Sequence, residues 1–277
     1  MQHKTVNQVC TLIVACLLSM TTFASAQNTI VTVTENPSAT STSLIGTNIF
    51  TFNNLPIGLN YNVSWDGVGK FDQLNVIKAN QYGGAPDAAN PGGSPYAVQG
   101  IGSIKTTTFT LNVPNSYFGL WWSAGDASNQ LSFYKNNTLV AQYTTASLLS
   151  GLDRSYFGNP LNRKLNSGEA YAFINFYGDA STSWDQIVLS NVTSSGFESD
   201  NFTTRQFSFN PKVDAPESLG KIVASIQKGT TTKVSNVPTT WVWTDKTSVP
   251  AAPVPPQAAL GLFALAFALR GRLYRTA

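Results

Sequence analysis

The chain has 277 residues, of which 17 are Lys or Arg, 14 are Asp or Glu, one is His and two are Cys. Charged residues make up 11% of the chain, whereas a soluble domain typically carries about 25%. The polar surface must therefore come from Ser, Thr, Asn and Gln, which is typical of an extracellular β-protein and argues against a cytosolic enzyme.

Residues 1–26 have the pattern of a secretory signal peptide. His3 and Lys4 provide a short basic start, a mostly apolar run covers residues 9–20, and Ala24-Ser25-Ala26 supplies a small-x-small cleavage site. We therefore expect the mature chain to begin at Gln27.

Loss of this signal peptide would remove every His, Cys and Met of the chain, which are Met1, His3, Cys10, Cys16 and Met20. The mature protein would then have no Ser-His-Asp or Cys-His nucleophile, no metal site ligated by His or Cys, and no disulfide. Its fold must be held by the hydrophobic core alone.

The body, residues 27–248, lacks the apolar period of a helix and instead has short β-branched and aromatic runs separated by Gly, Asn, Ser and Pro. One short helix is expected at residues 146–152. Strands are expected at residues 30–34, 44–52, 106–113, 117–122, 130–135, 138–144, 170–177, 184–190, 201–209, 221–226 and 240–243.

The clearest local prediction is a hairpin in which Asn136-Asn137 forms a two-residue turn between residues 130–135 and 138–143, since Asn tolerates positive φ. In that register Phe133 faces Val140 and Tyr134 faces Leu139. Many short strands with regular turn signals predict an all-β fold, an antiparallel β-sandwich. Residues 81–102, rich in Gly and Pro, are expected to form a long surface loop suited to binding.

The C-terminal end combines three segments in a fixed order. A proline-rich linker covers residues 249–256, an uncharged apolar run covers 258–269, and Arg270, Arg272 and Arg275 follow. The run is shorter than the roughly 20 residues that span a bilayer, but a helix over residues 257–277 with snorkelling arginines nearly closes the gap. The arginines place this transmembrane helix with its end in the cytoplasm and the β-domain outside.

Charge gives no reason to expect nucleic acid as a partner. Without Lys4 and the three C-terminal arginines, 13 basic residues stand against 14 acidic ones, a net of −1. A nearly neutral body lacks the excess of positive charge that attracts a polyanion.

The order of proline motif, hydrophobic helix and arginine cluster resembles the PEP-CTERM sorting tail. The family motif is Val-Pro-Glu-Pro, and this chain has the glutamate-free variant Val254-Pro255-Pro256. The resemblance implies transient anchoring in the inner membrane and processing by an exosortase-like membrane transpeptidase of a Gram-negative-type bacterium that makes extracellular polysaccharide.

Three segments of the body resemble exosortase-dependent surface proteins. Residues 51–58 (TFNNLPIG) look like the opening strand of their jelly-roll domains, and residues 117–126 (YFGLWWSAGD) and 196–202 (GFESDNF) look like two of their central motifs. The resemblance covers about residues 46–209 and implies a secreted, surface-exposed, jelly-roll-like β-sandwich without an established catalytic activity.

Glu198, Asp200 and Asn201 form the strongest metal hypothesis. On an extended strand Glu198 and Asp200 point to the same face, and Asn201 adds a third hard oxygen ligand, which suits a structural Ca²⁺. Jelly-roll domains with a similar final strand often hold calcium there, as the resemblance implies. The alternative is that both carboxylates cap the turn at Gly196 and accept backbone N–H bonds.

Five carboxylates could supply a glycosidase pair, because hydrolysis needs one protonated acid and one ionised partner at about 5–5.5 Å or 6.5–9.5 Å. No local catalytic motif accompanies them, so the chain is predicted not to be an enzyme. They are Asp126, Glu169, Asp179, Asp185 and Glu198.

Trp65, Trp121, Trp122 and Trp184 raise the alternative of carbohydrate binding. Trp121 and Trp122 are adjacent, so on a strand they point to opposite faces and at most one is expected in the core. The other is either a platform for a glycan or covered by a neighbouring loop.

The function predicted from the whole sequence is a non-catalytic protein of the cell surface or extracellular matrix, with extracellular polysaccharide as a further partner. The alternative is a carbohydrate-binding or glycan-cleaving module that uses the same export route.

Overall fold

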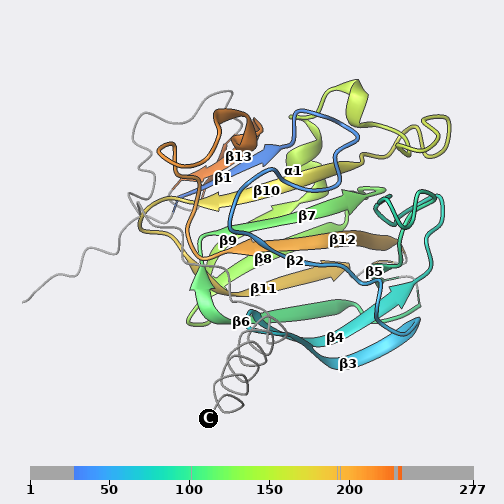
Figure 1. Ribbon diagram of the computed structural model, residues 1–277, viewed down its shortest axis with the longest axis horizontal. Helices are drawn as coiled ribbons and strands as arrows, with labels where there is room; N and C mark the ends of the chain where they lie inside the picture. The colour runs from blue at the N-terminus through green and yellow to red at the C-terminus, as the bar shows by residue number, and fades with distance from the viewer. Residues whose placement is uncertain (1–27, 101, 192, 194, 228–229, 233–277) are drawn as a thin grey trace, which may run out of the picture.

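The computed structural model describes residues 28–100, 102–191, 193, 195–227 and 230–232. These residues form one large antiparallel sheet that curls into a half-barrel, which confirms the all-β fold class (Figure 1). The strands are β1 (Thr29–Val33), β2 (Asn48–Phe50), β3 (Gly58–Trp65), β4 (Gly69–Ile77), β5 (Tyr96–Gly100), β6 (Thr106–Asn115), β7 (Tyr117–Ser123), β8 (Asn129–Lys135), β9 (Thr138–Thr144), β10 (Ala172–Gly178), β11 (Trp184–Asn191), β12 (Gly196–Arg205), β13 (Lys221–Gln227) and β14 (Thr230–Thr232).

The order across the sheet is β14-β13-β1-β10-β7-β12-β5-β4-β6-β11-β8-β9, with β2 paired to β12 and β3 paired to β4. Although β7 and β8 lie well apart in this order, the rings of Phe118 and Phe133 contact each other with centroids 6.1 Å apart. Phe133 also lies 5.1 Å from Phe176 of β10. The sheet must therefore curl until its two halves face each other across a shared aromatic core.

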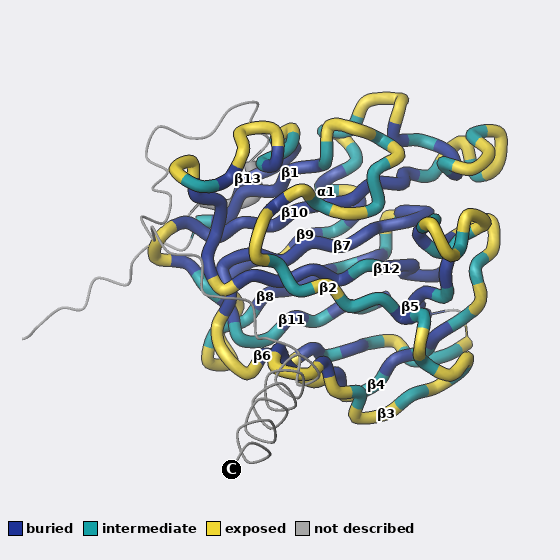
Figure 2. The backbone as a smooth tube through the Cα atoms, viewed as in Figure 1, coloured by how far each residue is buried: buried dark blue, intermediate teal, exposed yellow. Residues whose placement is uncertain are grey.

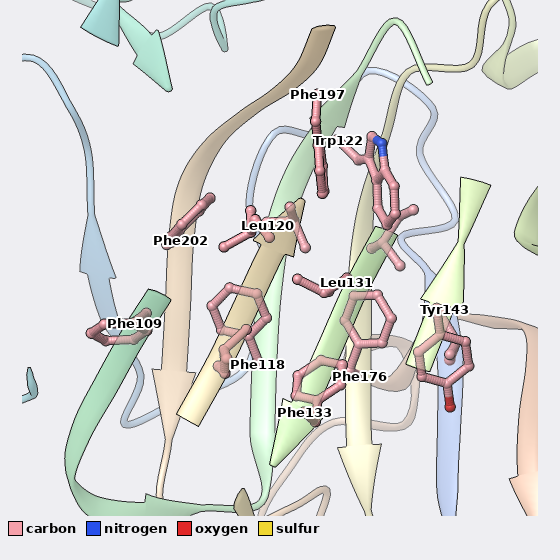
Figure 3. Close-up of a cluster of buried hydrophobic side chains, with 14 of the residues drawn as sticks. Phe109, Phe118, Leu120, Trp122, Leu131, Phe133, Tyr143, Phe176, Phe197 and Phe202 are labelled. Atoms are coloured by element: carbon pink, nitrogen blue, oxygen red, sulfur yellow. The ribbon is translucent and has the colours of Figure 1, made fainter. Parts of the chain in front are cut away.

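Aromatic side chains fill this core (Figure 3). Trp122 of β7 stacks on Phe197 of β12 at 4.6 Å, and Phe71 stacks on Phe109 at 4.4 Å. Rings of this size each remove a large apolar area from water and are the main contribution to the hydrophobic stability of the domain.

The strands β7 and β10 are buried along their whole length (Figure 2). One face lies on the main core, and the other is covered by loops that carry smaller apolar clusters. Trp121, on the opposite face from Trp122, packs with Ala85 and Tyr171. Trp122 therefore lies in the main core and Trp121 lies under neighbouring loops, which is the second of the two alternatives expected for it.

Most of the predicted strands are present, with shifted ends. The run at residues 44–52 is a strand only at Asn48–Phe50, and the strand expected from 201 begins at Gly196. The strands β3, β4, β5 and β14 were not predicted, although Asp66-Gly67 between β3 and β4 is a standard hairpin signal. Alternating polar residues obscured the first two, and β5 lies inside the expected surface loop 81–102, where it is fully buried. The run 240–243 lies outside the described residues.

The β8–β9 hairpin is confirmed. Asn136 and Asn137 have φ of 48° and 61°, and Tyr134 pairs with Leu139 as expected. Phe133, however, pairs with Ala141 and not with Val140, because a bulge follows Leu139. The bulge turns both Val140 and Ala141 toward the core, which a regular alternating strand does not allow.

The predicted short helix is confirmed as α1 (Thr145–Leu149), which begins with a capping box between Thr144 and Ser147. Two 3₁₀ turns, at Arg154–Tyr156 and Pro216–Leu219, complete the helical elements of the described part. No helix among the described residues is long and apolar enough to cross a bilayer. The signal segment 1–26, Val254, Pro255, Pro256 and the arginines 270, 272 and 275 lie outside those residues, so the tail prediction stays a prediction.

Candidate functional site

A cavity of about 290 Å³ opens beside the N-terminal half of β12. Three carboxyl groups lie on its wall, although the chain has few charged residues. Its lining residues are Tyr82, Ala124, Asp126, Glu169, Ser195, Gly196 and Glu198. Three of the five carboxylates considered from the sequence as a glycosidase set therefore meet at one place.

Glu198 enters the cavity from the middle of the sheet. It pairs with Val98 of β5 on one side and Ser123 of β7 on the other, and only 3% of it is exposed. Its Oε2 has no hydrogen-bond partner. The pKa of Glu198 is raised to about 8, mainly by burial and in addition by the negative charges of Asp126 and Glu169, while a backbone hydrogen bond opposes the rise. This carboxyl is therefore largely protonated at neutral pH.

Asp126 and Glu169 reach the cavity from two neighbouring loops. The loop after β7 turns at Ala124, a non-glycine residue with φ of 44°, and Gly125 N donates to Ala170 O at 3.0 Å. This hydrogen bond holds Asp126 and Glu169 next to each other. Burial and the charge of Asp126 raise the pKa of Glu169, whose Oε2 is buried without a partner.

Tyr82 forms the aromatic part of the rim and is 41% exposed. Its position is fixed by the preceding carbonyl, because Gln81 O accepts hydrogen bonds from Asn159 Nδ2 at 2.8 Å, Asn166 Nδ2 at 2.8 Å and Tyr171 Oη at 2.7 Å. Three donors on one carbonyl hold the tip of the β4–β5 loop against the cavity, so the rim is preorganised.

Asp200 has a different role from Glu198, although both lie on β12. Its Oδ2 accepts hydrogen bonds from Ala85 N at 3.0 Å and Ser94 Oγ at 2.6 Å, and its Oδ1 accepts from Asn201 N at 2.7 Å. The pKa of Asp200 is raised to about 6, because the effect of burial exceeds the lowering by these donors. Asp200 therefore anchors the β4–β5 loop through donors outside the Gly196 turn, whereas the alternative expected both carboxylates to cap that turn.

The predicted calcium ligands do not converge in this structure. Asp200 uses both oxygens on protein donors, and Asn201, at a bulge with φ of 50°, donates its Nδ2 to Thr40 O at 2.8 Å. Within the described part of the chain no three His, Cys, Asp or Glu side chains are grouped closely enough to hold a metal ion. The donor set does not fit Ca²⁺ as it stands, and calcium binding stays an untested prediction.

The remaining two carboxylates of the glycosidase set are structural. Asp179 accepts from Asn28 Nδ2 at 2.7 Å and Thr182 Oγ1 at 2.7 Å. Asp185 lies 3.5 Å from Lys135 Nζ and accepts from Asn136 N in the β8–β9 turn. Neither lines the acidic cavity.

None of the four tryptophans in the described part of the chain offers a flat platform for a sugar. Trp121 and Trp122 are 1% and 2% exposed, and Trp65 and Trp184 are also buried. The hypothesis that Trp121 or Trp122 forms an exposed glycan platform is therefore wrong in this structure, because loops cover the outer face of β7. The exposed ring beside the carboxyl groups belongs to Tyr82, which the sequence analysis did not single out.

A repeated sequence signal does mark the cavity. Each of its acidic residues follows a small residue and a glycine, in Ala124-Gly125-Asp126, Ser167-Gly168-Glu169 and Ser195-Gly196-Phe197-Glu198.

Comparison with known proteins found no family model, no curated protein and no solved structure that matches this chain. Function must therefore be argued from the chain itself.

Proposed function

We propose that this chain is a non-catalytic exported protein, displayed at the bacterial surface or in the extracellular matrix after sorting by an exosortase-like transpeptidase. The observation that carries the proposal is the order of segments in residues 249–277: a proline motif, an apolar run, and Arg270, Arg272 and Arg275. That order suits a segment that halts in the inner membrane with its arginines on the cytoplasmic side.

The position of β1 supports the predicted cleavage site. Its first residue, Thr29, follows shortly after the expected new terminus at Gln27, and the strand lies fully buried between β10 and β13. Asn28 already contacts the fold, since its Nδ2 donates to Asp179 Oδ2 at 2.7 Å. A chain that begins at Gln27 would thus keep every strand of the sheet.

We also propose that the curled sheet is a jelly-roll-like sandwich. The aromatic contacts of Phe133 with Phe118 and Phe176 join the two facing halves of the sheet, as inner-face side chains do in a sandwich.

The deciding experiment is intact-mass analysis and C-terminal sequencing of the secreted protein from its native host, with the same chain expressed in a host that lacks the transpeptidase as control. Cleavage close to Pro255 only in the native host supports the proposal. A secreted protein that retains residues 257–277 would contradict it.

A second candidate function is a carbohydrate-binding or glycan-cleaving module that uses the same export route. It is favoured by the cavity, in which a protonated Glu198 lies near Asp126 and Glu169, the combination that glycoside hydrolysis requires. Release of reducing ends from bacterial polysaccharide by the secreted protein, abolished by Glu198→Gln, would identify cleavage.

A further inference from the structure

The acidic cavity has no cationic side chain to balance it. None of the described residues that line it is Lys or Arg. The described ion pairs of Lys135, Arg205 and Lys221 are made with Asp185, Asp214 and Asp153, which lie elsewhere. Three carboxyl groups at one cavity without a counter-charge favour a positively charged ligand.

Two of these carboxyl groups also have unused hydrogen-bonding capacity. Oε2 of Glu198 and Oε2 of Glu169 are both buried and accept no hydrogen bond, and the whole Glu198 residue is only 3% exposed. A buried oxygen without a donor is costly, and a ligand that brings N–H groups removes that cost. The unpartnered oxygens therefore indicate a donor that comes from outside the chain.

The size of the cavity argues against a bare metal ion. About 290 Å³ is far more than one ion occupies, and the acidic side chains of the described residues are not grouped as metal ligands. A ligand with several donors on an organic framework can span this space.

We propose that the cavity binds a primary ammonium group carried on a polar organic framework, with the ammonium between Glu169 and Glu198 and the framework against Tyr82. An ammonium group can donate N–H bonds to the unpartnered oxygens of Glu169 and Glu198. Its positive charge favours the ionised form of both carboxyl groups, and hydrogen bonds between ionised partners are the stronger kind. The half-exposed ring of Tyr82 adds an apolar surface and a π-face that attracts a nearby cation.

The site is built in advance for such a ligand. The three donors on Gln81 O fix Tyr82, and the hydrogen bond from Gly125 N to Ala170 O fixes the loops of Asp126 and Glu169. Rigid walls lower the entropy that a ligand must overcome on binding. This inference stands independently of the export proposal, and it names a ligand class for the second candidate function if the framework is a sugar.

Two sources of the ammonium are distinguished by isothermal titration calorimetry on the purified secreted protein. The probes are glucosamine oligosaccharides, the N-acetylated oligosaccharides of the same length, spermidine and CaCl₂. We expect the glucosamine oligosaccharide or spermidine to bind, and N-acetylation to weaken sugar binding by about tenfold or more, since it removes the charge. Stronger binding of the oligosaccharide than of spermidine identifies an amino sugar, and the reverse identifies a polyamine.

Variants locate the binding. Glu198→Gln and Glu169→Gln should each weaken the bound amine about tenfold or more, whereas Asp185→Asn, which removes a carboxylate outside the cavity, should leave its affinity unchanged. If Glu198→Gln does not fold, Glu169→Gln alone decides, because Glu169 is only partly buried. Equal binding of the free and N-acetylated sugars, binding of calcium alone, or no amine binding at millimolar concentrations would overturn the proposal. Because the secreted protein is the starting material, each of these results leaves the export proposal unaffected.

Discussion

Burial raises the pKa of Glu198 and the negative charge of Glu169 adds to the rise, because the two carboxyl groups lie on the wall of one cavity although they come from separate segments of the chain. Glu169 precedes β10, and Glu198 lies on β12, two strands away in the sheet. A pair of carboxyl groups that cannot both ionise freely is a typical feature of functional sites.

The pH dependence of stability should reveal the protonated Glu198. Its pKa is about 8 in the folded protein against a usual value of 4.5. Between these two pH values the unfolded chain ionises Glu198 while the folded protein keeps its proton, so stability falls as pH rises from about 4.5 to about 8 and then levels off. The loss attributable to this residue is on the order of 5 kcal/mol at most.

Urea unfolding at a series of pH values measures this effect in the wild type and in Glu198→Gln. In Glu198→Gln the free energy of unfolding should fall much less between those pH values. In Asp185→Asn it should fall as in the wild type. Parallel pH profiles for the wild type and Glu198→Gln would show that Glu198 ionises normally in the folded protein.

Asp200→Ala should loosen the β4–β5 loop without unfolding the sheet. The change leaves Ala85 N and Ser94 Oγ without the acceptor that they share. We expect the free energy of unfolding to fall by about 1–3 kcal/mol and the amide of Ala85 to exchange faster with solvent. Hydrogen exchange measures the second effect, and Ser94→Ala, which removes one of the donors, should give a smaller change. An unchanged exchange rate at Ala85 would rule out Asp200 as the anchor.

Arg205 and Asp214 form a buried ion pair whose loss should be costly. Arg205 Nη1 lies 2.8 Å from Asp214 Oδ1, and the two side chains are 1% and 0% exposed. Arg205→Met leaves the Asp214 charge buried and unpaired, so we expect about 3–5 kcal/mol of destabilisation in urea unfolding. Adding Asp214→Asn removes that charge and keeps an acceptor for Asn210 N, so the double variant should recover part of the loss. A double variant that is less stable than Arg205→Met would contradict the unpaired-charge explanation.

The arginine cluster of the tail should decide retention in the membrane. Replacing Arg270, Arg272 and Arg275 with Asp removes the positive charges that hold the segment on the cytoplasmic side. We expect the triple variant to escape processing, measured by cell fractionation and the intact mass of the secreted protein. Lys replacements at the same positions keep the charge and serve as the matched control. Wild-type processing of the Asp variant would remove the physical basis of the sorting proposal.

Local features of this protein could be predicted from the sequence, because they depend on neighbouring residues. Asn136-Asn137 adopts positive φ in a two-residue turn, and the Thr144–Ser147 capping box begins α1 near the expected helix. Alternating apolar residues in β6 and β11 marked strands with one face on the core. The Val140 bulge was not predictable, because it depends on which residues of β9 face the curled core.

The sequence by itself determined the all-β class, the hairpin and the chemical types of the acidic residues in the cavity. Only the tertiary structure decided that Asp126, Glu169 and Glu198 share a wall, since they belong to loops and strands joined by sheet pairing between distant segments. It also decided that Trp121 and Trp122 are both buried, because the loops that cover β7 come from elsewhere in the chain. Burial and proximity are properties of the folded chain, and they convert ordinary carboxylates into a site in which Glu198 holds its proton at neutral pH.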